Sequence, residues 1–272
     1  MQINPPLTDA PGTTTVEPAP TSHARPRRTV SVASRTTVQP AHHRWYVRSK
    51  VAFDFVLACL LAVPAVPLVL LAALLVRLTS RGPAFYTQTR VGLNGKPFTI
   101  IKLRSMVHNC ESLTGPRWSM PGDPRITPIG WFLRASHIDE LPQLLNVLRG
   151  EMSLVGPRPE RPEFVPELER ALPTYRQRLN VRPGVTGLAQ VQLAPDTDLE
   201  SVRRKLTHDL YYVRHVSPWL DVKLIFGTAF YAAGVPAGVL ARVLGLPAGA
   251  EIERATRDLV PDAVPHRNRL SA

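Results

Sequence analysis

Residues 51–76, VAFDFVLACLLAVPAVPLVLLAALLV, decide the fold. An apolar run of this length can cross a bilayer as a helix. Pro64 and Pro67 stand in its middle, where each removes a backbone donor and disfavours a straight helix. Basic residues flank both ends, so the segment lacks the charge asymmetry from which the positive-inside rule assigns an orientation. We therefore expect a re-entrant helix–break–helix segment that bends at the two prolines. A kinked span and a buried core helix are the alternatives.

The composition of the chain favours an anionic partner. Its 272 residues are long enough for one sizeable domain plus tails. A formal net charge of +12 suits nucleic acid, anionic lipid or a phosphorylated substrate. The two cysteines, Cys59 and Cys110, have no framework spacing and are expected to be reduced thiols.

The two ends of the chain are polar and differ from the middle. Residues 1–43 are rich in Pro, Thr, Ser and Ala and contain few large apolar side chains, so they are expected to form a disordered tail. Residues 219–246 are apolar again and favour an interfacial helix, with a packed core helix as the alternative. The tail after residue 251 is expected to be loose.

The middle of the chain carries clear secondary-structure signals. Residues 84–104 predict a β-hairpin around the turn pair Asn94-Gly95. Helical stretches are expected over 126–134, 139–149, 162–180 with an interruption at Pro173, and 199–215.

Two adjacent carboxylates stand in the run RASHIDELPQ, residues 134–143. Proline is tolerated only in the first turn of a helix, so Pro142 predicts a helix that begins close to Asp139. Free N–H groups at that end favour anions. Neighbouring side chains on a helix project about 100° apart. Asp139 and Glu140 therefore do not face each other across a substrate bond, as the two catalytic carboxylates of a glycosidase do. One aspartate can instead attack phosphorus and form an acyl phosphate. The plainer interpretation is a helix N-terminal charge pair.

Basic side chains in rigid motifs accompany this pair. Arg158 stands between Pro157 and Pro159, which hold the backbone extended and suit bidentate binding of a phosphate. Arg134 precedes Asp139 by five residues, and the second hairpin strand ends with Lys102 and Arg104. Each of these alone fits a surface salt bridge. Their joint occurrence favours a phosphate site.

In this order the motifs resemble the bacterial sugar transferase family, the monotopic phosphoglycosyl transferases. The resemblance covers roughly residues 45–235. It rests on the apolar segment and on residues 82–92, 102–106, 123–130, 134–146, 150–160 and 182–187.

The resemblance implies a reaction and its participants. The family moves a sugar-1-phosphate from a UDP-sugar to undecaprenyl (polyprenyl) phosphate and releases UMP, by a ping-pong route, as the initiating step of exopolysaccharide, capsule or glycan assembly. It uses Mg²⁺, for which Asp139 is the expected ligand. The identity of the sugar is not implied.

The resemblance also implies residue roles. Asp139 falls on the family's nucleophile, and Glu140 is its base or electrostatic partner. The other expected site residues fall into three groups: phosphate contacts at Lys102, Arg104, Arg134 and Arg158; site-shaping residues Gly156, Pro157 and Pro159; and the membrane break at Pro64 and Pro67.

The expected architecture is of the α+β class and mainly α. A disordered tail (1–43) precedes a re-entrant membrane helix (44–81), a catalytic domain with a small β-hairpin and interfacial helices (82–235), and a C-terminal apolar segment with a loose tail (236–272). The catalytic domain is expected on the cytoplasmic face of the bacterial inner membrane. Membrane lipid is an expected partner, nucleic acid is not, and a homodimer is left open. The rival hypothesis is a membrane-tethered basic binding or scaffold protein without catalysis.

Overall fold

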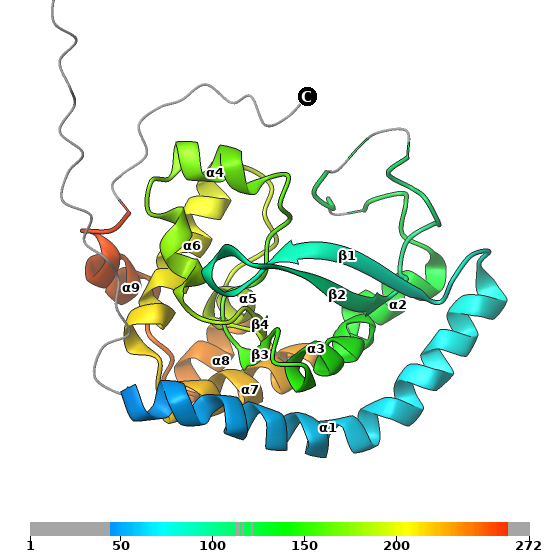
Figure 1. Ribbon diagram of the computed structural model, residues 1–272, viewed down its shortest axis with the longest axis horizontal. Coiled ribbons are helices and arrows are strands. Elements are labelled where there is room, and N and C mark those ends of the chain that lie inside the picture. Colours follow the sequence, from blue (N-terminus) through cyan, green and yellow to red (C-terminus); the bar gives the residue numbers. More distant parts are fainter. Residues whose placement is uncertain (1–43, 113–114, 116, 121, 261–272) are drawn as a thin grey trace, which may run out of the picture. The chain divides into compact units, whose positions relative to one another are not determined.

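The computed structural model describes residues 44–260 except 113, 114, 116 and 121 (Figure 1), so the predicted tail 1–43 lies outside the described residues. These residues form mainly helices with two small two-stranded sheets, which confirms the α+β, mainly helical class. The strands are β1 (Phe85–Val91), β2 (Pro97–Leu103), β3 (Ser153–Val155) and β4 (Gly184–Thr186). The α-helices are α1 (Arg44–Thr79), α2 (Pro128–Ala135), α3 (Leu144–Leu148), α4 (Val165–Ala171), α5 (Leu188–Gln192), α6 (Leu199–His215), α7 (Pro218–Ala232), α8 (Ala237–Val243) and α9 (Gly249–Thr256). Short 3₁₀ helices are η1 (Leu93–Gly95), η2 (Ile138–Gln143) and η3 (Tyr175–Asn180).

The apolar segment forms one uninterrupted helix, so the predicted break between two helices is wrong. Pro64 and Pro67 both lie inside α1, which bends along its length (Figure 1). A proline removes one hydrogen bond and kinks a helix, while the flanking turns keep theirs. Among the described residues, this is the one helix long and apolar enough to cross a membrane, and only 17% of its most apolar window is buried. That exposure excludes the buried core helix.

Both ends of α1 pack on the same globular domain. Near its N-terminus, the buried Tyr46 and Ala58 belong to the largest apolar cluster of the domain. Near its C-terminus, Val76 packs in a second cluster with Leu103 of β2 and Leu133 of α2. Between these ends, Ala65 also belongs to the first cluster, so α1 packs on the same domain along its length.

A buried polar network fastens the N-terminal part of α1. The carboxylate of Asp221 on α7 accepts hydrogen bonds from Tyr46 (2.6 Å) and from Tyr212 of α6 (2.7 Å). Asp54 of α1 accepts one from the Ser153 hydroxyl of β3 (2.7 Å). Because buried carboxylates need such partners, these bonds fix α1 directly against α7 and β3, and α7 in turn against α6.

The predicted hairpin is confirmed. Strands β1 and β2 pair antiparallel from Phe85↔Leu103 to Val91↔Pro97. The turn residues Asn94 and Gly95 have φ of 56° and 81°, as a turn of the I′ kind requires.

A second, parallel strand pair was not predicted. β3 and β4 are only three residues long, too short for a periodic signal in the sequence. They approach each other at glycines: a Cβ added to Gly184 would stand 2.1 Å from the backbone nitrogen of Gly156, and one on Gly187 would stand 2.2 Å from the Gly156 oxygen. The pair sets the path of the chain that continues into Pro157 and Arg158.

The expectation of a loose tail after residue 251 is wrong up to residue 260. Helix α9 packs on α6 through Ile252, which is fully buried, and through a hydrogen bond from Tyr211 to Glu251 (3.1 Å). The Arg214–Asp258 ion pair (2.6 Å) adds to this contact. The burial of a few apolar side chains is enough to hold this short helix on the domain, although most of its residues are polar.

Helix α7 has one buried and one exposed apolar face. Leu220 and Leu224 are buried, whereas Trp219, Phe226 and Phe230 are exposed. The packed core helix is therefore found on one face of α7. The interfacial position stays a prediction, which the aromatic side chains on the other face leave open.

Candidate active site

The predicted start of a helix near Asp139 is confirmed, although its first turns are 3₁₀ rather than α. The chain enters η2 through His137, which has a left-handed φ of 56°. Asp139 and Glu140 occupy the first turn, and Pro142 lies in the next. A non-glycine residue in the left-handed region is uncommon and marks a sharp reversal of the chain. This reversal turns the carboxylate pair toward β2.

Two cations hold Glu140. Lys102 Nζ lies 2.7 Å from Glu140 Oε1, and Arg158 Nη2 lies 2.6 Å from the same oxygen. Arg158 Nη1 also donates to Oε2 (3.2 Å), so the guanidinium binds the carboxylate in a bidentate manner. Burial by itself raises the pKa of Glu140, but the charges of Arg158 and Lys102 hold that pKa well below its ordinary value. Glu140 is therefore ionised with both oxygens engaged.

Asp139 is in the opposite situation. Its side chain is buried, and Oδ1 has no hydrogen-bond partner among the described residues. Burial and then the charge of Glu140 raise the pKa of Asp139 to about 6, while Lys102 and Arg134 act in the opposite direction. Burial disfavours the charged form of Lys102 as well, and this lowers the pKa of Lys102 to about 8. An aspartate with one oxygen unpartnered among the described residues, close to cations, can act as a nucleophile toward phosphorus.

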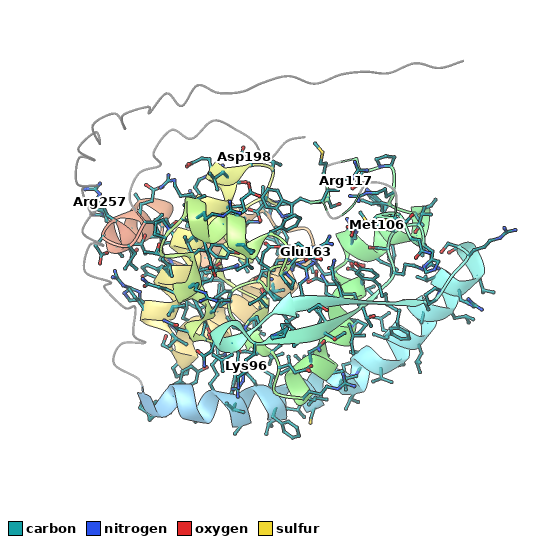
Figure 2. All side chains as sticks on the ribbon, turned by 45° about the horizontal axis from the view of Figure 1, so that its top comes forward. Lys96, Met106, Arg117, Glu163, Asp198 and Arg257 are labelled. Atoms are coloured by element: carbon teal, nitrogen blue, oxygen red, sulfur yellow. The ribbon has the colours of Figure 1, made fainter. Side chains whose placement is uncertain are left out.

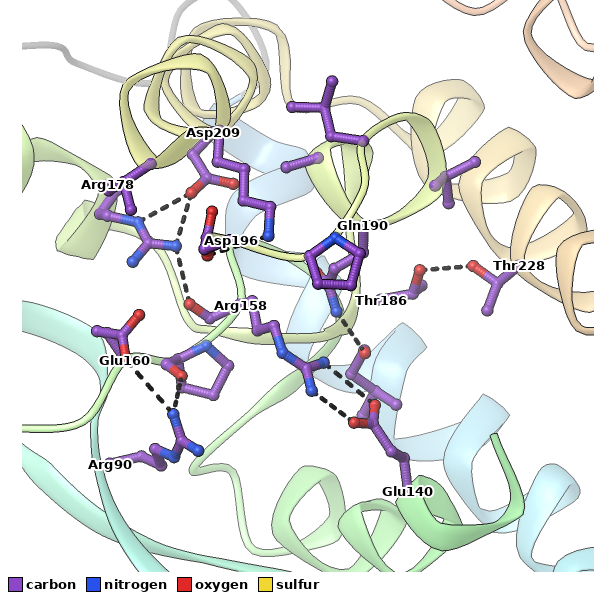
Figure 3. A pocket seen from close by; sticks show the side chains of 18 of the residues that line it. Arg90, Glu140, Arg158, Glu160, Arg178, Thr186, Gln190, Asp196, Asp209 and Thr228 are labelled. Atoms are coloured by element: carbon purple, nitrogen blue, oxygen red, sulfur yellow. Dashed lines mark hydrogen bonds and ion pairs between the residues drawn. The ribbon is translucent and has the colours of Figure 1, made fainter. Parts of the chain in front are cut away.

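The backbone around Arg158 is anchored from two sides. Arg178, itself paired with the buried Asp209 at 2.6 Å, donates to the Arg158 carbonyl (2.8 Å). Arg90 donates to the Pro159 carbonyl (3.1 Å). Figure 3 shows these contacts on one side of the Arg158–Glu140 pair. The Arg158 side chain stays 45% exposed, so a fixed backbone presents an accessible guanidinium.

Six of the predicted residues line one cavity of about 970 Å³: Lys102, Arg104, Arg134, Asp139, Glu140 and Arg158. Arg134 donates to the hydroxyls of Ser105 (2.8 Å) and Ser119 (2.9 Å), which orient its guanidinium. Side chains of the loop after β2 complete the wall, and two of them, Met106 and Arg117, are labelled in Figure 2. The volume lies in the range typical of ligand sites.

The expectation that Arg104 contacts phosphate is not supported. Arg104 is buried, and although it touches the wall of the same cavity, its guanidinium donates to the carbonyls of Pro83 (2.6 Å) and Ser80 (3.0 Å). It ties the connection between α1 and β1 to the end of β2. The motif in the sequence does not reveal which of two nearby cations meets backbone carbonyls, because that depends on where the α1–β1 connection passes.

The site-shaping prediction for Gly156 agrees with the geometry. A Cβ on Gly156 would stand 2.4 Å from the Arg182 carbonyl oxygen, so only glycine fits between the two strands. Sequence reasoning missed Gln190 and Asp196, which line a second cavity of about 430 Å³ beside the first. No motif marks them.

Comparison with known proteins places these features in context. The family model described as bacterial sugar transferase matches residues 45–234. The UDP-N-acetylgalactosamine-undecaprenyl-phosphate N-acetylgalactosaminephosphotransferase of Aeromonas hydrophila is 45% identical over 174 residues, which are 64% of this chain and 41% of that protein. The UDP-glucose:undecaprenyl-phosphate glucose-1-phosphate transferase of Caulobacter vibrioides is 47% identical over 181 residues, 66% of this chain and 67% of that protein. The exopolysaccharide production protein PSS of Rhizobium leguminosarum is 42% identical over 184 residues, 66% of this chain and 92% of that protein. The chain thus spans less than half of the Aeromonas protein.

Proposed function

Since this chain belongs to the bacterial sugar transferase family, we propose that it is a phosphoglycosyl transferase that moves a sugar-1-phosphate from a UDP-sugar to undecaprenyl phosphate and releases UMP. The observation that carries the proposal is Asp139, a buried carboxylate with an unpartnered oxygen among the described residues, in a cavity with Lys102, Arg134 and Arg158. The reactions named for the Aeromonas and Caulobacter relatives support it. The setting that we propose is exopolysaccharide or capsule assembly, in line with the name of the Rhizobium relative.

The chemistry proceeds in two displacements at one phosphorus. A carboxylate oxygen of Asp139 attacks the phosphorus that carries the sugar, the bond from that phosphorus to the bridging oxygen breaks, and UMP leaves with the electron pair. An oxygen of the lipid phosphate then attacks the same phosphorus. The bond to Asp139 breaks and the carboxylate is restored, so the enzyme ends as it began.

Glu140 acts as an electrostatic anchor rather than as a base. Its ionised carboxylate holds Lys102 and Arg158 at 2.7 and 2.6 Å, which keeps two cations beside the reacting phosphates. A carboxylate whose pKa is held well below its ordinary value takes up a proton poorly. Fixed cations stabilise charge that develops on the leaving phosphate.

Asp139 is the residue that would hold Mg²⁺. The described residues contain no group of three His, Cys, Asp or Glu side chains placed to bind a metal. Mg²⁺ needs fewer protein ligands, since it commonly uses one or two carboxylates together with substrate phosphates. Asp139 has an unpartnered oxygen among the described residues, whereas the oxygens of Glu140 are occupied, so the donor set fits an ion that arrives with the diphosphate. When bound, such an ion neutralises charge on the leaving UMP.

We also propose that α1 re-enters the membrane rather than crosses it. Both ends pack on the same domain through Tyr46 and Val76, which supports exit by the face of entry. Exposed aromatic side chains of α7, among them Phe226 and Phe230, suit the lipid interface. The domain then lies at headgroup level on the cytoplasmic face, where the carrier phosphate is found.

Cysteine labelling in intact bacteria tests this topology. We expect Ser49→Cys and Thr79→Cys, introduced singly at exposed positions near the two ends of α1, to be protected from a membrane-impermeant maleimide and labelled after permeabilisation. Cys59 and Cys110 are first replaced by serine to remove background. Labelling of one position alone in intact cells indicates a span and contradicts re-entry.

The proposed reaction is tested by UMP release. Purified protein with undecaprenyl phosphate and Mg²⁺ is offered UDP-glucose, UDP-galactose and their N-acetylated forms. We expect release with at least one donor, dependent on both lipid and metal. No release from any donor by folded, membrane-inserted protein favours the scaffold hypothesis.

A further inference from the structure

A second cavity adjoins the one that contains Asp139. It has a volume of about 430 Å³, and its walls come from η3, β4, α5, α6 and α7. Arg158 and Glu140 line both cavities, so the ion pair between them forms a shared wall. Figure 3 shows Thr186, Gln190 and Asp196 with this pair around one space.

The two cavities differ in charge. Among the described residues, eight Lys and Arg side chains line the first cavity against four Asp and Glu. The second has four of each. Two of its cations are neutralised within the wall, in the pairs Arg178–Asp209 (2.6 Å) and Lys205–Asp196 (3.0 Å). The first cavity therefore suits a diphosphate, and the second suits a polar group without charge.

Two side chains that line the second cavity carry buried acceptor oxygens with unused hydrogen-bonding capacity. Gln190 Oε1 and Asp196 Oδ1 have no partner among the described residues. The amide nitrogen of Gln190 is held by the Val185 carbonyl at 2.9 Å, which fixes the orientation of the side chain. The hydroxyls of Thr186 and Thr228 meet across the wall. Carboxylate and amide oxygens accept hydrogen bonds from hydroxyl groups.

We propose that this second cavity binds the sugar of the nucleotide donor and that Gln190 and Asp196 select which sugar is accepted, an inference that rests on the proposed function. The sugar is bonded directly to the phosphorus that Asp139 attacks, so it must lie next to Arg158 and Glu140. The base is separated from that phosphorus by the ribose and the other phosphate. A neutral, hydroxyl-rich ring beside the cationic site matches both the position and the charge of the cavity.

Donor kinetics of three variants test the assignment. Gln190→Leu and Asp196→Leu remove the proposed acceptors. Gln192→Leu is the matched control, because Gln192 lies on the same helix and donates to a backbone carbonyl, that of Pro247 (3.0 Å), without lining the cavity. The probes are UDP-glucose, UDP-galactose, UDP-N-acetylglucosamine and UDP-N-acetylgalactosamine, with UDP as an inhibitor that lacks the sugar.

We expect kcat/KM for the best donor to fall about tenfold or more in Gln190→Leu and Asp196→Leu. The ranking of the four donors should change, while Ki for UDP and KM for undecaprenyl phosphate stay within about twofold. Gln192→Leu should keep the wild-type ranking.

Other outcomes overturn the assignment in distinct ways. A parallel rise of Ki for UDP would assign the cavity to the nucleotide. A rise confined to KM for undecaprenyl phosphate would assign it to the acceptor. Equal losses for all donors, or the same change of ranking in Gln192→Leu, would reduce these residues to a structural role. Wild-type protein that releases no UMP from any donor would overturn the proposed function, and this inference with it.

Discussion

Replacement of Asp139 by asparagine is expected to lower UMP release by about 10³-fold or more. An amide is isosteric with the carboxylate but does not attack phosphorus. The substitution costs little stability, since Oδ1 makes no hydrogen bond with the described residues and the carboxylate is already poorly solvated. The measurement is steady-state UMP release, together with a single turnover in which donor radiolabelled in the sugar is mixed with protein in the absence of acceptor.

The single turnover separates the mechanism from the overall reaction. Wild-type protein should retain label covalently and pass it to undecaprenyl phosphate added later, whereas Asp139→Asn should retain none. Asp139→Ala guards against slow hydrolysis of the new amide, and Asp258→Asn serves as a control at an exposed carboxylate (55% exposed). Turnover in both Asp139 variants would exclude this residue as the nucleophile. Loss of turnover with normal membrane association would show that tethering does not need the reaction.

Gly184→Ala is expected to have the largest effect on stability. The added Cβ would lie 2.1 Å from the nitrogen of Gly156 and 2.2 Å from the oxygen of Thr186. The first belongs to the residue that follows β3 and the second to β4 itself, so the backbone of both segments must shift. We expect a loss of about 3 kcal/mol or more, seen as a fall in melting temperature of roughly 10 °C in detergent. Activity should fall as well, because the same strands lead into Arg158.

A second glycine supplies the matched control. Gly238 lies in α8, and an added Cβ meets no atom within 4 Å. Gly238→Ala should leave the melting temperature unchanged or slightly raised, because alanine favours the helix. If Gly184→Ala melts within about 2 °C of wild type and keeps its activity, the close strand approach does not position the site.

The local features of this chain were predictable because they depend on neighbours in the sequence. Asn94-Gly95 predicted the hairpin since few other pairs adopt two positive φ angles, and both angles are observed. Pro142 placed the start of η2 beside Asp139. Pro173 lies between α4 and η3, at the predicted interruption. The ordered motifs likewise identified the family, whose model covers residues 45–234.

The tertiary structure decided how these elements use their side chains. Arg104 donates to backbone carbonyls and Lys102 pairs with Glu140, although the two cations are only two residues apart at the end of β2. The tertiary structure also packed Ile252 against the core in a segment whose polar composition suggested a loose tail.

The sequence by itself therefore determined the class, the hairpin, the apolar segment and the place of the carboxylate pair at the start of η2, because each follows from local stereochemistry or from an ordered motif. Only the tertiary structure decided that α1 is one bent helix with both ends on one domain, that β3 and β4 meet at Gly156 and Gly184, and that Gln190 and Asp196 face a cavity beside Arg158. The physical reason is the same in each case. Pairings between distant segments depend on shape, burial and the partners that remain for each polar group, and these exist only once the chain has folded.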